Sequence, residues 1–198
     1  MGGRDLVLAA RAAEAGGATA VQLRMKRAGA GAMLAAARRL RAELTVPLYL
    51  NDRADVAWGA RAQGVHVGAD DLPADALRAV APPGFRIGVS VGTPAEAEAA
   101  RRGDPDYWSI GSVFATASKA DAGAPIGIPG FRTLAALAPA RLPVIGIGGI
   151  TAENAGEVIA AGGRGVAVIG AVFAARNIEV AARTIRQAVD QALKGRET

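Results

Sequence analysis

A loop of small polar residues in the second half of the chain has the composition of an anion-binding site. It follows a β-branched and aromatic run that starts at Tyr107, and it contains Thr116, Ser118 and Lys119. Only three of the 23 lysine and arginine residues are lysines. A lysine offers a compact charge with three donors, which suits a phosphate or a developing anion. The loop therefore predicts a phosphate-binding segment, with a solvated surface loop as the alternative.

Two carboxylates follow neighbouring strands of the expected sheet. Asn51 and Asp52 end one strand, and Asp71 lies just beyond the next. Adjacent parallel strands bring such ends side by side, and Mg²⁺ is usually held by one or two carboxylates together with a phosphorylated substrate. The pattern predicts that Asp52 and Asp71 hold magnesium. Capping of a helix that starts at Pro73 would explain Asp71 alone, but it does not explain both residues.

A glutamine and an arginine share one face of the first expected strand. Gln22 and Arg24 lie two residues apart, so both should point into a barrel, and Lys26 follows just above them. Burying an amide and a guanidinium is costly unless partners await them. A phosphorylated ligand is one such partner, and an internal hydrogen-bonded network around the arginine is the other.

Further small or polar residues fall at the ends of later strands. Ser90 ends one of them and adds a hydroxyl to the same rim. Glycine-containing loops follow the last two strands, one with Gly149 and one with Ile169 and Gly170, and barrels often bind phosphate through backbone amides there. His66 alternates with two valines, which favours an inward histidine whose hydrogen bonds are satisfied by the protein.

Composition excludes several classes of protein. The chain has no cysteine and a single histidine, which removes disulfides, thiolate nucleophiles and most histidine-dependent triads. The net charge of +5 fits anionic partners, although an arginine-rich genome would produce the same charge. Without a basic block or interleaved aromatic residues, phosphorylated small molecules are favoured over nucleic acid. No apolar run reaches the ~18 residues of a membrane span and the amino terminus does not resemble a signal peptide, so we expect a cytoplasmic protein.

Strands and helices alternate along the chain without a linker, which predicts a single domain over residues 1–198. Near-continuous apolar strands separated by helices are typical of a parallel sheet. Polar residues gather at the carboxyl ends of these strands, which favours a TIM (β/α)8 barrel over a doubly wound sheet. Seven strands are expected: Thr19 to Arg24, Pro47 to Asn51, Gly64 to Gly68, Arg86 to Val91, Tyr107 to Val113, Pro143 to Gly148 and Gly165 to Ile169.

Capping residues mark the helices between these strands. We expect N-caps at Asp5 and Thr151 and a capping box over Thr93-Pro-Ala-Glu96. The helix that starts at Pro73 is expected to bury Val80.

An eightfold barrel would need one more strand before Asp5. Either the chain begins at an internal methionine and has lost that strand, or the barrel stays open there. An open parallel barrel has two unpaired edges, which favours aggregation or pairing with another chain.

Several ordered motifs together resemble the thiamine-phosphate synthase family, and the resemblance covers essentially the whole chain. They lie at residues 22–26, 51–55, 64–68, 71–73, 88–91, 116–119 and 148–150. The resemblance implies a TIM-barrel transferase that joins hydroxymethylpyrimidine diphosphate to a thiazole phosphate and releases diphosphate. The motifs keep this order along the chain and are specific as a set.

The resemblance also implies roles for individual residues. The residues implied to contact the pyrimidine diphosphate are Gln22, Arg24, Lys26, Asn51, Ser90 and Lys119, of which Arg24, Ser90 and Lys119 are implied to act in catalysis. The residues implied to hold Mg²⁺ are Asp52 and Asp71. Those implied to bind thiazole phosphate are Thr116, Ser118, Gly149, Ile169 and Gly170. Such a reaction needs charge neutralisation on the diphosphate and no general base, which agrees with a chain that lacks cysteine and has one histidine.

Three residues depart from the family's usual pattern, and two other functions stay open. Ser118 stands where threonine is common, Gly170 where serine is common and Gly92 where histidine is frequent. The related thiazole tautomerase would need only the thiazole site. The intact residues for the diphosphate argue against it, namely Lys26, Asp52, Asp71 and Lys119. A non-catalytic barrel that binds thiazole phosphate is the second alternative.

Overall fold

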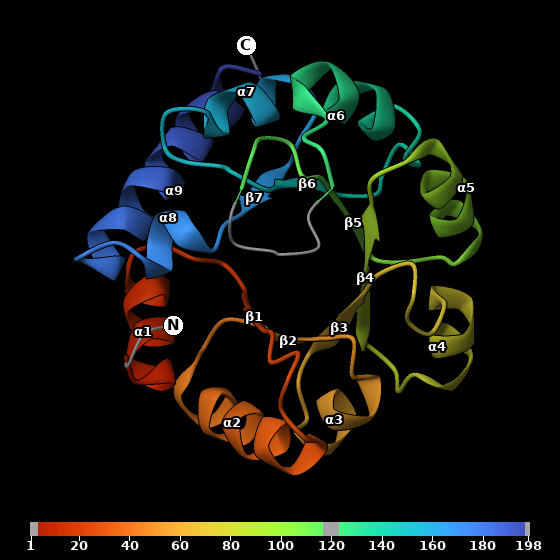
Figure 1. The fold of residues 1–198 in the computed structure, drawn as a ribbon, viewed down its shortest axis with the longest axis vertical. Coiled ribbons are helices and arrows are strands. Elements are labelled where there is room, and N and C mark those ends of the chain that lie inside the picture. Colours follow the sequence, from red (N-terminus) through yellow and green to blue (C-terminus); the bar gives the residue numbers. More distant parts are fainter. Residues whose placement is uncertain (1–3, 117–122, 197–198) are drawn as a thin grey trace.

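Strands and helices alternate around a curled sheet in the computed structural model, which describes residues 4–116 and 123–196 (Figure 1). The strands are β1 Val21–Leu23, β2 Leu48–Asn51, β3 Gly64–Val67, β4 Arg86–Val91, β5 Tyr107–Ile110, β6 Val144–Ile147 and β7 Gly165–Ala167. The helices are α1 Leu6–Ala15, α2 Ala30–Glu43, α3 Ala54–Gly59, α4 Ala74–Val80, α5 Pro94–Arg102, α6 Gly127–Ala135, α7 Ala155–Ala160, α8 Gly170–Phe173 and α9 Ile178–Lys194.

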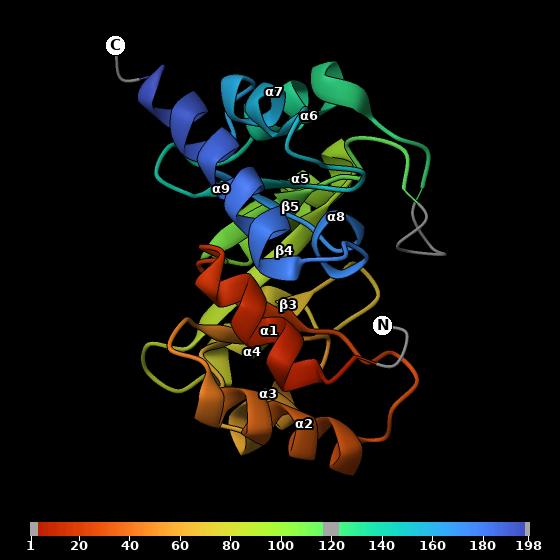
Figure 2. The same ribbon diagram turned by 90° about the vertical axis from the view of Figure 1, so that its left-hand side faces the viewer.

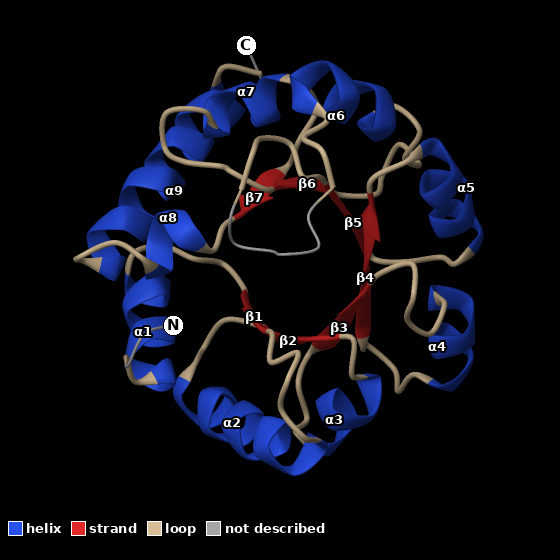
Figure 3. Cartoon of the chain, in the orientation of Figure 1, coloured by secondary structure: helices blue, strands red, loops and turns tan. Residues whose placement is uncertain are grey.

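The sheet is parallel throughout, and each strand pairs with the next one along the chain, from β1 to β7. The helices form a ring outside the strands (Figure 3). This arrangement confirms the expected TIM-like barrel, with all strand carboxyl ends at one rim. β1 and β7 are the two edges of the described sheet, while α1 and α9 pack against each other on the outside between them (Figures 1 and 2).

Local sequence features explain where the helices begin. The Asp5 carboxylate accepts hydrogen bonds from the amides of Val7 and Leu8 at 2.9 and 3.1 Å, so it caps α1 as expected. The capping box before α5 is complete, because Thr93 caps the amide of Glu96 and the Glu96 side chain reaches back to the amide of Thr93.

The main core lies between the outer face of the sheet and the helices. Leu50, Val65, Ile87 and Trp108 come from four consecutive strands, and all four are fully buried. Burial of each such side chain stabilises the fold by about 1.5–3 kcal/mol. The opposite strand face carries polar residues, because side chains alternate along a strand and the register aligns them across strands. Asn51, His66, Gly88 and Tyr107 form one such row, and Ser90 pairs with Ser109 in the next.

Some expected local features were wrong. Val80 is 67% exposed, because α4 ends there and its buried face is provided by Ala74 and Leu77. Thr151 does not cap α7. Its amide instead donates to the Asn154 side chain at 2.9 Å, and Asn154 is the residue that precedes the helix. No helix among the described residues is long and apolar enough to cross a membrane.

Loss of one buried side chain from β2 should destabilise the rim that carries the polar residues. We expect Leu50→Ala to lower the free energy of unfolding by about 2–5 kcal/mol, because the cavity it leaves lies under β2. The matched control is Leu8→Ala, since Leu8 is 69% exposed, and this change should stay within about 0.5 kcal/mol. Urea denaturation measures both values, and equal effects would contradict the packing described here.

Candidate active site

The polar residues at the carboxyl rim form two neighbouring groups. One follows β1, β2 and β3 and is made of Arg24, Lys26, Asp52 and Asp71, here called the charged cluster. The other is a pocket at the ends of β4 to β7.

The two carboxylates of the charged cluster are in contact, although they come from different loops. Asp52 directly follows β2 with φ of 65°, and its amide donates to the carbonyl of His66 at 2.8 Å. Asp71 lies in the loop after β3, and its carboxylate accepts from the amide of Gly68 at 2.8 Å. Asp71 therefore closes the turn after β3, and it makes no cap for α4, which has no side-chain cap.

Electrostatics within the cluster favour an added positive charge. Burial raises the pKa of Asp52, and its hydrogen bond with Asp71 and the charge of that carboxyl raise it further, whereas Lys26 and Arg24 lower it. No group of three or more His, Cys, Asp or Glu side chains able to hold a metal occurs in the described part of the chain. A cation held by this pair would take its remaining ligands from water and substrate, as Mg²⁺ commonly does.

The first strand differs from its expected environment. Gln22 is exposed on β1, which is an edge of the described sheet. Its side chain hydrogen-bonds Tyr107. Arg24 is half-buried and Lys26 is exposed, so the expected cost of burying the glutamine does not arise. Asn51 is buried beside His66 in register.

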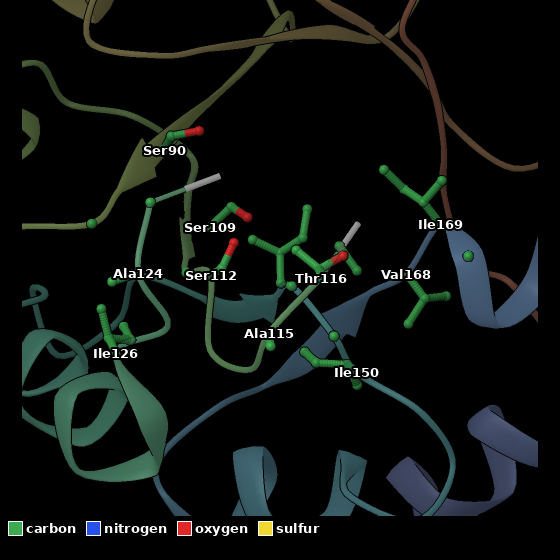
Figure 4. A pocket seen from close by; sticks show the side chains of 18 of the residues that line it. Ser90, Ser109, Ser112, Ala115, Thr116, Ala124, Ile126, Ile150, Val168 and Ile169 are labelled. Atoms are coloured by element: carbon green, nitrogen blue, oxygen red, sulfur yellow. The ribbon is translucent and has the colours of Figure 1, made fainter. Parts of the chain in front are cut away.

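The pocket has a volume of about 700 Å³ and two kinds of wall (Figure 4). Hydroxyls of Ser90, Ser109 and Ser112 stand on one side, and the apolar side chains of Val168 and Ile169 stand on the other. The first wall can donate hydrogen bonds, and the second can cover a ring. Such a mixture suits a small molecule with one polar end.

Two glycines after β6 let that loop pass close to the loop after β5. Gly148 and Gly149 have φ of 98° and 63°, a region that side chains disfavour. A Cβ on Gly149 would lie 2.4 Å from the carbonyl oxygen of Ala115. Asn154 holds the same loop, because its amide nitrogen donates to the carbonyl of Gly149 at 3.1 Å.

The structure brings most of the predicted site residues to this rim. The residues of the charged cluster are Arg24, Lys26, Asp52 and Asp71, and Asn51 directly precedes Asp52. Those lining the pocket are Ser90, Thr116, Gly149, Ile169 and Gly170. Ser118 and Lys119 lie outside the described residues.

Sequence reasoning missed Ser109, Ser112 and Tyr107. Tyr107 and Ser109 alternate with the buried Trp108 and Ile110, and this alternation could have placed Tyr107 and Ser109 on the inner face. Ser112 follows β5 in an irregular loop, where no periodic pattern indicates which way a side chain points.

Comparison with known proteins identifies the family. The family model described as thiamine monophosphate synthase matches residues 1–172. The chain belongs to this family. It is 45% identical over 195 residues to thiamine-phosphate synthase of Moorella thermoacetica, covering 96% of this chain and 91% of the relative. It is 47% identical to the enzyme of the same name from Roseiflexus castenholzii, covering 93% of this chain and 81% of that protein.

A solved structure agrees with this assignment. Thiamine phosphate pyrophosphorylase from Pyrococcus furiosus superposes with a TM-score of 0.85 at 36% identity, covering 96% of this chain and 92% of the other. Family membership makes the chain a transferase of thiamine biosynthesis. The comparisons give no support to a thiazole tautomerase or a non-catalytic barrel.

A side chain at Gly149 should destabilise the close packing of the loops after β5 and β6. We expect Gly149→Ala to lower the free energy of unfolding by about 1–3 kcal/mol, because the Cβ meets the Ala115 carbonyl in an unfavourable backbone region. Gly156→Ala serves as the control. Gly156 lies in α7, and the nearest atom to an added Cβ would be the Cβ of Ala192 in α9, 3.9 Å away, so this change should raise stability by about 0.4–1 kcal/mol. Chemical denaturation that ranks the two variants in the opposite order would contradict the close approach.

Proposed function

We propose that this chain condenses hydroxymethylpyrimidine diphosphate with hydroxyethylthiazole phosphate to give thiamine monophosphate and diphosphate. The observation that carries the proposal is the contact between the Asp52 and Asp71 carboxyls, with Arg24 and Lys26 beside them, on the same rim as the pocket. A diphosphate needs positive charge around it, and a heterocycle needs a partly apolar pocket. Both environments occur at this rim. The cytoplasmic location expected from the sequence stays a prediction.

The charged cluster is proposed to take the pyrimidine diphosphate. Arg24 and Lys26 offer donors to its phosphate oxygens, and Lys119, which comes after β5 in the sequence, is proposed to add a third cation. Gln22, Asn51 and Ser90 supply amide and hydroxyl groups that can orient the pyrimidine end. Ser90 lines the pocket, so it lies where the two substrates would meet.

Asp52 and Asp71 are proposed to hold Mg²⁺. The contact between two like-charged carboxyls supports this role, because a cation removes their repulsion, and carboxylate oxygens are ligands that Mg²⁺ prefers. When bound there, Mg²⁺ would supply charge neutralisation to the diphosphate.

The pocket is proposed to take the thiazole phosphate. Gly149 and Gly170 let backbone amides approach the phosphate, and Thr116 and Ser118 add hydroxyl donors. Ile169 lies on the apolar wall and can cover the thiazole ring.

The chain's task in this reaction is to stabilise charge and exclude water. The bond between the pyrimidine methylene carbon and the diphosphate oxygen breaks, and its electron pair leaves with the diphosphate. Arg24 and Lys119 neutralise the charge that develops on the leaving group. The thiazole nitrogen then forms the new bond to carbon with its own lone pair, so no side chain has to remove a proton. The walls of the pocket keep water away from the pyrimidine cation.

The direct test of this proposal is product formation. Purified protein with both substrates and Mg²⁺ should form thiamine monophosphate and diphosphate in equal amounts. A thiazole tautomerase would instead isomerise its thiazole substrate and release no diphosphate. Failure to release diphosphate from the pyrimidine substrate would overturn the proposed function.

Removal of the loop lysine should slow turnover strongly. We expect Lys119→Ala to lower kcat by about a hundredfold or more, because one charge that stabilises the departing diphosphate is lost. Lys194→Ala in the last turn of α9 is the matched control and should leave kcat near the wild-type value. Steady-state kinetics that find near-normal turnover in Lys119→Ala would refute the role.

Neutralising one carboxylate should separate metal binding from folding. We expect Mg²⁺ with inorganic diphosphate to raise the melting temperature of the wild type and to leave that of Asp52→Asn unchanged. In metal-free buffer Asp52→Asn should be at least as stable as the wild type, because one of two like charges in contact is gone. Differential scanning calorimetry measures both effects, and Asp55→Asn is the control for a carboxylate paired with Arg53 at the surface. An equal Mg²⁺ shift in Asp52→Asn would show that the metal is held elsewhere.

A further inference from the structure

A series of hydrogen bonds joins residues of four strands, β1, β3, β4 and β5, beneath the pocket. The His66 imidazole lies between two hydroxyls, with Nδ1 3.0 Å from the Tyr107 Oη and Nε2 2.9 Å from the Ser90 Oγ. The Tyr107 hydroxyl also hydrogen-bonds the side chain of Gln22. The series therefore links Gln22, Tyr107, His66 and Ser90, and two of these four residues are proposed to bind the pyrimidine substrate.

A glycine makes this crossing possible. Tyr107 is on β5 and His66 is on β3, with β4 between them. A Cβ on Gly88 of β4 would lie only 2.0 Å from the Cζ of Tyr107, so the tyrosine ring occupies the space above this glycine. There it stacks on the imidazole, with ring centroids 5.5 Å apart and an interplanar angle of 27°. The geometry holds the tyrosine hydroxyl against Nδ1.

The partners of the imidazole determine where its proton lies. A neutral imidazole has one donor and one acceptor nitrogen. Of Tyr107 and the imidazole, the phenol is the more acidic donor, so the Tyr107 O–H donates to Nδ1 and accepts from the Gln22 amide. Burial raises the pKa of Tyr107, which keeps this proton on the phenol. The proton of His66 is then on Nε2, where it donates to the Ser90 oxygen.

The Ser90 hydroxyl is the last group in this series of hydrogen bonds. Because the Ser90 oxygen accepts from His66, its own O–H is left to point into the pocket that it lines. We propose that Tyr107 is a positioning residue: through His66 it keeps Ser90 as a hydrogen-bond donor to the substrate. The effect of Tyr107 on the reaction rests on the proposed function. The position of the proton on His66 rests on the hydrogen bonds alone.

The single histidine makes the proton arrangement directly measurable. In ¹⁵N-labelled full-length protein without an affinity tag, long-range ¹H–¹⁵N spectra at about pH 8 distinguish the two neutral tautomers from the imidazolium. We expect the Nε2–H tautomer in the wild type and its loss in Tyr107→Phe. An Nδ1–H tautomer or an imidazolium in the wild type would overturn the inference. The spectrum needs no turnover, so it determines the tautomer of His66 even if the protein forms no thiamine monophosphate. Absence of that product would overturn the proposed function and leave the tautomer unaffected.

A double-mutant cycle tests the consequence for the reaction. Tyr107→Phe keeps the ring and removes the hydroxyl, and we expect it to lower kcat about tenfold with KM within about twofold. In a Ser90→Ala background the same change should lower kcat by less than about twofold, because the group through which it acts is gone. Full additivity of the two changes would overturn the positioning role.

The matched control is Tyr49→Phe. Tyr49 packs edge-on against Tyr107, with ring centroids 5.7 Å apart. Its hydroxyl hydrogen-bonds Arg86, which is not among the residues that link Gln22 to Ser90. This variant should keep kcat and the Nε2–H tautomer. A loss of kcat equal to that of Tyr107→Phe would show that turnover depends on either buried hydroxyl whether or not it contacts His66, which would also overturn the inference.

Discussion

Parallel pairing of consecutive strands is the constraint on which the site depends. Each strand of the described sheet pairs with the next in one direction, so all carboxyl ends come to one rim although they are far apart in the chain. Asp52 and Asp71 touch because β2 and β3 are neighbours, and Ser90 meets Ser109 because β4 and β5 pair in register. The apolar outer face, buried against the helices, maintains this pairing and leaves the inner face free for polar groups.

The rim separates charge from hydroxyl and apolar groups. The charged cluster lies at the ends of β1 to β3, where carboxylates and cations balance one another, and the pocket lies at the ends of β4 to β7. Ser90 is on the boundary, because it lines the pocket while its oxygen contacts His66 beneath it. A reaction that separates an anion from a carbon cation benefits from such a division. The anion remains among charged groups, and the cation faces its acceptor in a drier space.

Much of the fold was predictable, and the misses have physical causes. Strand positions followed from apolar runs, and Asp5 and the capping box at Thr93 marked helix starts, because these effects act within a few residues. Thr151 was wrongly expected to be a cap, since a threonine before a helical pattern does not reveal that Asn154 takes its amide. Gln22 points inward as expected, because its side chain hydrogen-bonds Tyr107, but it is exposed, since exposure depends on what lies beside β1 and not on its own pattern.

The sequence by itself determined the class of fold and the residue types available for chemistry. Periodicity and composition are local properties, and a chain with no cysteine and one histidine must rely on carboxylates, cations, amides and hydroxyls. Only the tertiary structure decided which of them meet. Tyr107 reaches His66 because Gly88 leaves room above β4, and no spacing along the chain records that contact. Hydrogen bonds across strands depend on register and on the space between side chains, and both are set when the whole sheet packs.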